Sequence, residues 1–102
     1  MARRCACVFH VAAGPRVGFG HLMRARTLAR ALDVPMQLSL RGGRRARTVA
    51  RSQGWTLVSP TRRAVVVVVD DPSPRAAAIR ARQAARLGTR VVRIREIGRA
   101  HV

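Results

Sequence analysis

The sequence predicts an α/β fold that is doubly wound around a mostly parallel sheet of about five strands. Three observations favour this fold. Short apolar runs alternate along the chain with stretches whose apolar residues recur at helical spacing. One run holds five consecutive valines, residues 65–69, and such an unbroken β-branched run fits a strand that helices cover on both faces. A chain of 102 residues has room for one modest core, so we expect one domain or a piece of one.

The first half of the chain predicts three strands and two helices. A first strand over residues 5–12 is closed by Gly14 and Pro15, and a helix over residues 21–32 ends at Asp33. Alternating residues predict a second strand at 36–40, followed by a weaker helix at 44–53 and a third strand at 55–58. We expect the buried face of the first helix to consist of Leu22, Ala25, Leu28, Ala29 and Leu32.

The second half predicts two strands around one helix. The valine run gives a fourth strand over residues 64–69, and residues 90–94 give a fifth. Between them, Ser73 is a good N-cap and Pro74 suits the first helical position, so a helix follows over residues 75–87.

The connection from Val58 to Ala64 is short for this fold. About five residues reach only roughly 18 Å, which is barely enough to return the chain between two parallel strands. We therefore expect either that the third strand pairs differently or that the local topology is altered.

The charge is extreme and consists of arginine alone. A net charge of +17 comes from 21 basic residues without one lysine, against four acidic residues. Such a chain binds nucleic acid and acidic lipid non-specifically at low salt. However, an alanine-rich chain whose basic residues are all arginine is also typical of a GC-rich genome. We expect no specific nucleic-acid partner, because Phe9, Phe19 and Trp55 are the only aromatic residues and no recognition motif accompanies them.

The two cysteines indicate a reducing, cytoplasmic compartment. Cys5 and Cys7 lie two positions apart on the first predicted strand and so share a face, which does not favour a disulfide. His10 falls on the opposite face, so we expect buried thiols and no metal site. No segment is long enough to span a bilayer.

The best functional clue is the stretch at residues 17–24. Gly18 and Gly20 lack a Cβ, so both can adopt positive φ and let a ligand approach the backbone. His21 then lies on the first turn of a helix, where free N–H groups and the helix dipole disfavour the imidazolium and keep the ring available as a base. The alternatives are a plain tight turn and a histidine that merely caps or packs.

Three loops converge if this fold is right. In a doubly wound sheet, ligands bind beyond the carboxyl ends of the strands. Residues 18–21, 41–43 and 70–73 each follow a predicted strand and would open onto that edge. Asp70 is then a candidate ligand carboxylate, with a turn former as the alternative.

The motif Gly18-Phe19-Gly20-His21, which runs into Arg24, resembles a known family when it is taken with the strand that ends at Asp70. Over most of residues 5–95 the chain is similar to the amino-terminal half of the UDP-sugar hydrolase of pseudaminic-acid biosynthesis and its spore-coat-polysaccharide relatives. These proteins have the GT-B glycosyltransferase fold. The resemblance implies that residues 1–95 are a Rossmann-like amino-terminal domain of a GT-B protein.

The resemblance also implies a chemistry. His21 would be the general base that activates the water or acceptor attacking the anomeric carbon of a UDP-sugar, without a metal or another cofactor. The implied substrate-binding residues are Gly18, Phe19, Gly20, Arg24 and Asp70. In this fold the nucleotide is held chiefly by a carboxyl-terminal domain that this chain lacks, so we expect a truncated domain that is inactive alone. Ala12 and His10 differ from the residues that the hydrolases carry at these positions. A glycosyltransferase therefore remains an alternative to a hydrolase.

Residues 96–102 have no strand or helix periodicity. One ordinary choice of codons for them contains the start of a widely used sequencing adapter, so we expect read-through there and a natural chain that continues beyond Arg95. Two other functions remain open: a basic nucleic-acid-binding module and a non-catalytic α/β interaction domain.

Overall fold

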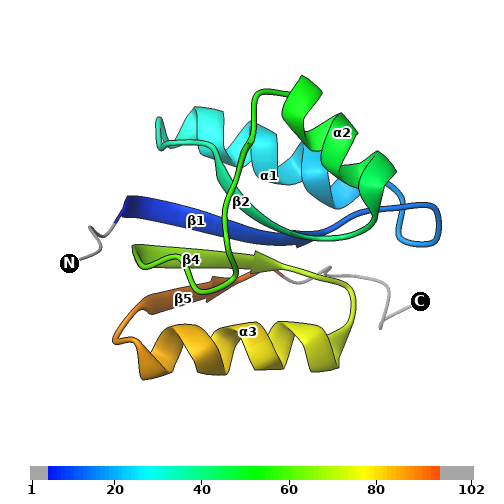
Figure 1. The fold of residues 1–102 in the computed structure, drawn as a ribbon. Coiled ribbons are helices and arrows are strands. Elements are labelled where there is room, and N and C mark those ends of the chain that lie inside the picture. The colour runs from blue at the N-terminus through cyan, green and yellow to red at the C-terminus, as the bar shows by residue number, and fades with distance from the viewer. Residues whose placement is uncertain (1–4, 95–102) are drawn as a thin grey trace, which may run out of the picture.

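A computed structural model describes residues 5–94 and shows a Rossmann-like α/β fold (Figure 1). Five strands form one sheet in the order β3-β2-β1-β4-β5, and every neighbouring pair is parallel. The elements are β1 Cys5–Ala12, α1 Gly20–Ala31, β2 Gln37–Arg41, α2 Arg44–Ser52, β3 Thr56–Leu57, β4 Ala64–Asp70, α3 Pro74–Arg86 and β5 Arg90–Arg93. The predicted fold class is confirmed, and the sheet is parallel throughout.

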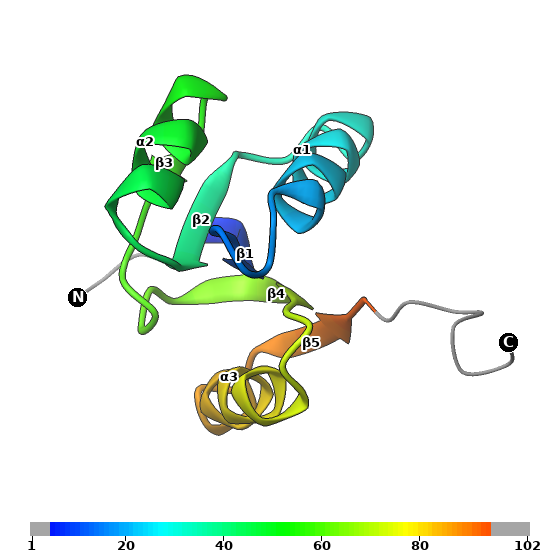
Figure 2. The same ribbon diagram turned by 90° about the vertical axis from the view of Figure 1, so that its right-hand side faces the viewer.

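The helices cover the two faces of the sheet unequally (Figure 2). Helices α1 and α2 lie on one face, where Phe9 and Val11 of β1 pack against Leu22, Ala25 and Ala29 of α1. The ring of Phe9 meets Trp55 edge to face, with 5.4 Å between the ring centroids. Burial of these apolar side chains is the main force that holds α1 over β1.

The other face is covered by α3. Val8, Val67 and Val69 pack there against Ala77 and Ala84, and the small alanine side chains let the helix approach the sheet closely. The predicted N-cap of this helix is found, because the Ser73 hydroxyl accepts a hydrogen bond from the Ala76 N–H at 3.2 Å.

The connection between β3 and β4 contains no helix. Strand β3 is only two residues long and pairs with Gln37 and Leu38 at the start of β2. Leu38 is also paired with Phe9, so the chain leaves the sheet level with the middle of β1. Arg63 then reaches Cys5 beside β4, where its carbonyl accepts the Cys5 N–H at 3.1 Å. Five residues suffice because the chain does not have to return along a full strand.

Two predicted core positions are wrong. Leu32 is 57% exposed, because α1 ends at Ala31 and the side chain lies beyond the helical face. Val65 is 52% exposed, although the valine run predicted cover on both faces. Strand β5 pairs with β4 only from Val66 onward, so Val65 lies at a corner of the sheet.

Both cysteines are free thiols, Cys7 buried and Cys5 half-buried. Within residues 5–94 no helix combines the length and the apolar character that crossing a bilayer demands. The predicted read-through at residues 96–102 lies outside the described residues.

Candidate functional site

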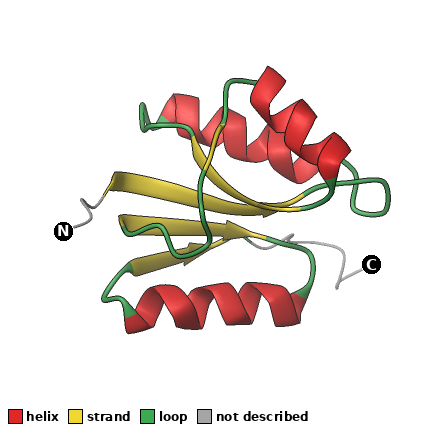
Figure 3. Cartoon of the chain, viewed as in Figure 1, coloured by secondary structure: helices red, strands yellow, loops and turns green. Residues whose placement is uncertain are grey.

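The loops that follow β1, β2 and β4 gather at one end of the sheet (green in Figure 3). This placement follows from the parallel topology, which puts the carboxyl ends of all the strands at the same edge. Ion pairs join these segments at two places: His21 and Arg24 of α1 pair with Asp70 at the end of β4, and Arg41 at the end of β2 pairs with Asp71.

The loop after β1 is closed by two glycines. The N–H of each donates to the carbonyl of the other, with Gly14 to Gly18 at 3.1 Å and Gly18 to Gly14 at 2.6 Å. Gly18 has a φ of +79°, so the predicted positive φ occurs there. Gly20 is instead the first residue of α1, and its backbone is helical. Phe19 is the N-cap residue of α1, and its half-buried side chain packs against the core on the α1 face.

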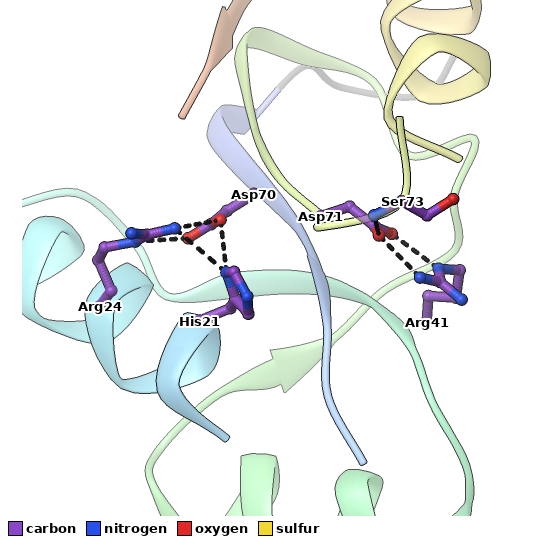
Figure 4. A network of polar contacts seen from close by, with 6 residues as sticks. All are labelled: His21, Arg24, Arg41, Asp70, Asp71 and Ser73. Atoms are coloured by element: carbon purple, nitrogen blue, oxygen red, sulfur yellow. Dashed lines mark hydrogen bonds and ion pairs between the residues drawn. The ribbon is translucent and has the colours of Figure 1, made fainter. Parts of the chain in front are cut away.

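His21, Arg24 and Asp70 form one polar cluster (Figure 4). The Nδ1 atom of His21 lies 2.8 Å from Oδ1 of Asp70. Arg24, one helical turn after His21, donates to both oxygens of the same carboxylate, from Nε at 2.9 Å and from Nη2 at 2.6 Å. Asp70 is only 1% exposed, so two partners compensate a buried charge.

This geometry selects one tautomer of His21. A carboxylate only accepts hydrogen bonds, so Nδ1 carries the hydrogen that binds Asp70. The Nη2 atom of Arg24 also lies 3.1 Å from Nδ1, and both nitrogens donate to Asp70. The lone pair of the neutral ring is therefore on Nε2, the nitrogen that Asp70 leaves free to accept a proton.

A second ion pair joins Arg41 to Asp71. Nε and Nη2 of Arg41 each donate to one carboxylate oxygen at 2.7 Å, and the Ser73 N–H donates to Oδ1 at 2.9 Å. Burial raises the pKa of Asp71, but the bonds from Arg41 and Ser73 outweigh burial and hold this pKa below its ordinary value. The pair fixes the β4–α3 loop to the end of β2.

A cavity of about 750 Å³ opens beside His21. Its lining includes His21, Arg24 and Asp70, whereas Gly18, Phe19 and Gly20 do not line it. The sequence did not single out Arg16 and Arg93, which line it as well. Within residues 5–94 neither has a carboxylate partner, whereas Asp70 and Asp71 are both paired. The sequence signal that could have found them is their position, Arg16 in the loop after β1 and Arg93 at the end of β5.

His10 lies apart from this site, on the α3 face of the sheet. It is 4% exposed, and its Nδ1 atom is buried without a partner. Burial, helped by the nearby charge of Arg80, lowers the pKa of His10 to about 4.

Burial also raises the pKa of the Cys7 thiol. Among the described residues, no group of three or more histidine, cysteine or acidic side chains could hold a metal ion.

Comparison of this chain with protein-family models, with curated proteins and with solved structures found no match.

Proposed function

We propose that this chain is the base-carrying domain of a nucleotide-sugar-processing protein, either a glycosyltransferase or a UDP-sugar hydrolase. The observation that carries the proposal is the 2.8 Å contact between His21 Nδ1 and the buried Asp70 carboxylate at the rim of a large cavity. A histidine held in one tautomer by a carboxylate is the arrangement that a general base needs.

The proposed step is a direct displacement at the anomeric carbon. The acceptor hydroxyl, or water, gives its proton to Nε2 of His21 while its oxygen forms a bond to the anomeric carbon. The bond from that carbon to the diphosphate oxygen breaks, and UDP leaves with the electron pair. Asp70 stabilises the imidazolium that forms, because its carboxylate already accepts from Nδ1.

Arg24 has a positioning role in this proposal. Its guanidinium forms two hydrogen bonds to Asp70, so it fixes the carboxylate that in turn orients His21. This differs from the substrate-binding role that the family resemblance implies for Arg24 and Asp70. The substrate's negative charge is matched instead by Arg16 and Arg93, whose charges have no carboxylate partner in residues 5–94.

The proposal is tested by UDP release from a panel of UDP-sugars, measured on the full-length protein that carries this chain. His21→Gln should lower kcat about 10²- to 10⁴-fold, the usual contribution of a general base. Arg86→Gln, on the exposed end of α3, is the matched control and should retain wild-type turnover. Wild-type turnover in His21→Gln, or no turnover of any UDP-sugar, would reject the proposal.

The net charge of +17 favours one other function, binding of nucleic acid. Affinity for random-sequence DNA that persists at about 150 mM salt and is unchanged by His21→Gln would favour that function. Binding that disappears as salt rises would be the non-specific attraction that any such charge produces.

A further inference from the structure

The two-residue length of β3 leaves a notch in the edge of the sheet. β3 pairs with β2 only at Gln37 and Leu38, and the last ladder bond there runs from the Val58 N–H to the Leu38 carbonyl at 2.8 Å. Alternate residues of a strand direct their backbone groups to the same side. The N–H and C=O of Leu40 therefore point to this edge, and among residues 5–94 no backbone partner reaches them.

A second cavity, of about 350 Å³, fills the notch. It lies between α2 and the segment after β3, and Ser39, Leu40, Arg47, Arg51 and Ser59 contribute to its lining. This volume is at the lower end of the range of small-molecule sites, about 300 to 1,000 Å³. None of the lining residues belongs to the cavity beside His21.

The polar groups in this notch are suited to donate hydrogen bonds. Arg47 and Arg51 lie one turn apart on α2, and no carboxylate within residues 5–94 pairs with either. The side chain of Ser39 lies on the other face of the sheet, where its Oγ accepts a bond from Arg80 of α3 at 3.4 Å, so the donors on the α2 side are the two guanidinium groups and the Leu40 N–H. No acidic residue lines the cavity.

We propose that this notch is a binding site for a phosphate-type oxyanion. The oxyanion would accept hydrogen bonds from the guanidinium groups of Arg47 and Arg51 and from the Leu40 N–H. The carbon portion of a small phosphate monoester would lie against Leu57 and Val58, which also line the cavity. The site does not depend on the function proposed for His21.

The experiment is a titration of the whole chain with inorganic phosphate and with glucose 6-phosphate, followed by NMR at about 150 mM NaCl, where long-range attraction is screened. The backbone amides of Ser39 and Leu40 should shift saturably. Arg47→Gln and Arg51→Gln should each weaken binding about tenfold, the effect of losing one charge-assisted hydrogen bond. Tighter binding of glucose 6-phosphate identifies a monoester as the ligand, and equal affinities identify free phosphate; either result supports the site.

The matched controls are Arg44→Gln and Arg45→Gln, which remove the same charge from the exposed start of the same helix and do not line the cavity. They should change the affinity less than twofold. Equal weakening by all four variants, or shifts spread over every arginine-rich surface, would show an adventitious ion only and overturn the site. Circular dichroism of each variant confirms that it folds.

Discussion

At the scale of single residues, the cluster of His21, Arg24 and Asp70 depends on where β4 ends. Asp70 is the last residue of β4 and is 1% exposed, so its charge requires partners close by. Both partners come from the first turns of α1, three residues apart and therefore on one face. The catalytic proposal thus rests on a contact between residues 49 positions apart in the chain.

Asp70→Asn keeps His21 but removes the carboxylate that orients its ring, so this variant tests whether the orientation matters. An asparagine amide can donate to Nδ1 and so favour the wrong tautomer, which should lower kcat by about 10²-fold or more with a smaller change in KM. Nitrogen-15 NMR of His21 should show the hydrogen on Nδ1 in the wild type and on Nε2 in the variant. A wild-type Nδ1–H signal and unchanged kcat in Asp70→Asn would contradict the positioning role.

His10 should make stability depend on pH in a defined window. Its folded-state pKa of about 4 lies below the ordinary 6.5, so the unfolded chain binds a proton more readily. The contribution of neutral His10 to folding stability is fully present above pH 6.5 and is lost as pH falls toward 4. Over this range the free energy of unfolding should decrease by up to about 3 kcal/mol. Urea unfolding between about pH 7 and pH 4.5 measures this loss.

His10→Gln is the control, because glutamine does not titrate, and it should flatten the curve in that window. Asp71 contributes little to this pH dependence, because its pKa is lowered from 3.8 and it therefore titrates below the pH range of the experiment. An equally steep decline in His10→Gln would assign the effect to another group.

At the scale of elements, periodicity predicted the strands and helices well. The predicted helix at 44–53 is observed as Arg44–Ser52, and the predicted strand at 64–69 as Ala64–Asp70. The sequence could not predict which strands would be short, because the length of β3 depends on how the chain returns to β4. The ion pair between Arg41 and Asp71 escaped prediction for a similar reason: it depends on the strand order that brings β2 and β4 to either side of β1.

The two glycines before α2 should respond differently to substitution. A Cβ on Gly42 would press into the backbone carbonyl of Ala13 and lie 2.9 Å from the Ala46 Cβ, whereas a Cβ on Gly43 would meet nothing within 4 Å. Gly42→Ala should destabilise the protein by about 1–3 kcal/mol, the usual effect of overpacking. Gly43→Ala should cost about 1 kcal/mol or less, in keeping with its N-cap position. Urea unfolding compares the two, and equal effects would contradict the close approach of Gly42 to Ala13.

At the scale of the whole molecule, charge opposes folding. The net charge of +17 is spread over a small fold in which residues 5–94 contain only Asp33, Asp70 and Asp71 as acidic residues. Like charges repel one another in the compact state, and added salt screens that repulsion. Composition alone is enough to predict this repulsion, because the net charge does not depend on the fold.

Salt should therefore stabilise the protein. Raising NaCl from about 20 mM to about 500 mM should raise Tm by roughly 5 °C or more, because the screening length falls well below the size of the domain. Replacing the exposed arginines of α3 with glutamine, at Arg75, Arg82 and Arg86, should reduce the dependence of Tm on salt. A Tm that stays constant or falls with salt would show that self-repulsion is not a significant term.

The central place of β1 has a consequence for synthesis on the ribosome. This strand is made before the four others described, yet one of its two neighbours, β4, begins at Ala64, and the pairing of Cys5 with Ala64 closes that side of the ladder. Until that segment has left the exit tunnel, the nascent chain holds an apolar strand with one edge unpaired, a state that is prone to aggregation. The unpaired edge of β1 is therefore a candidate chaperone-binding segment until Ala64–Asp70 has been synthesised.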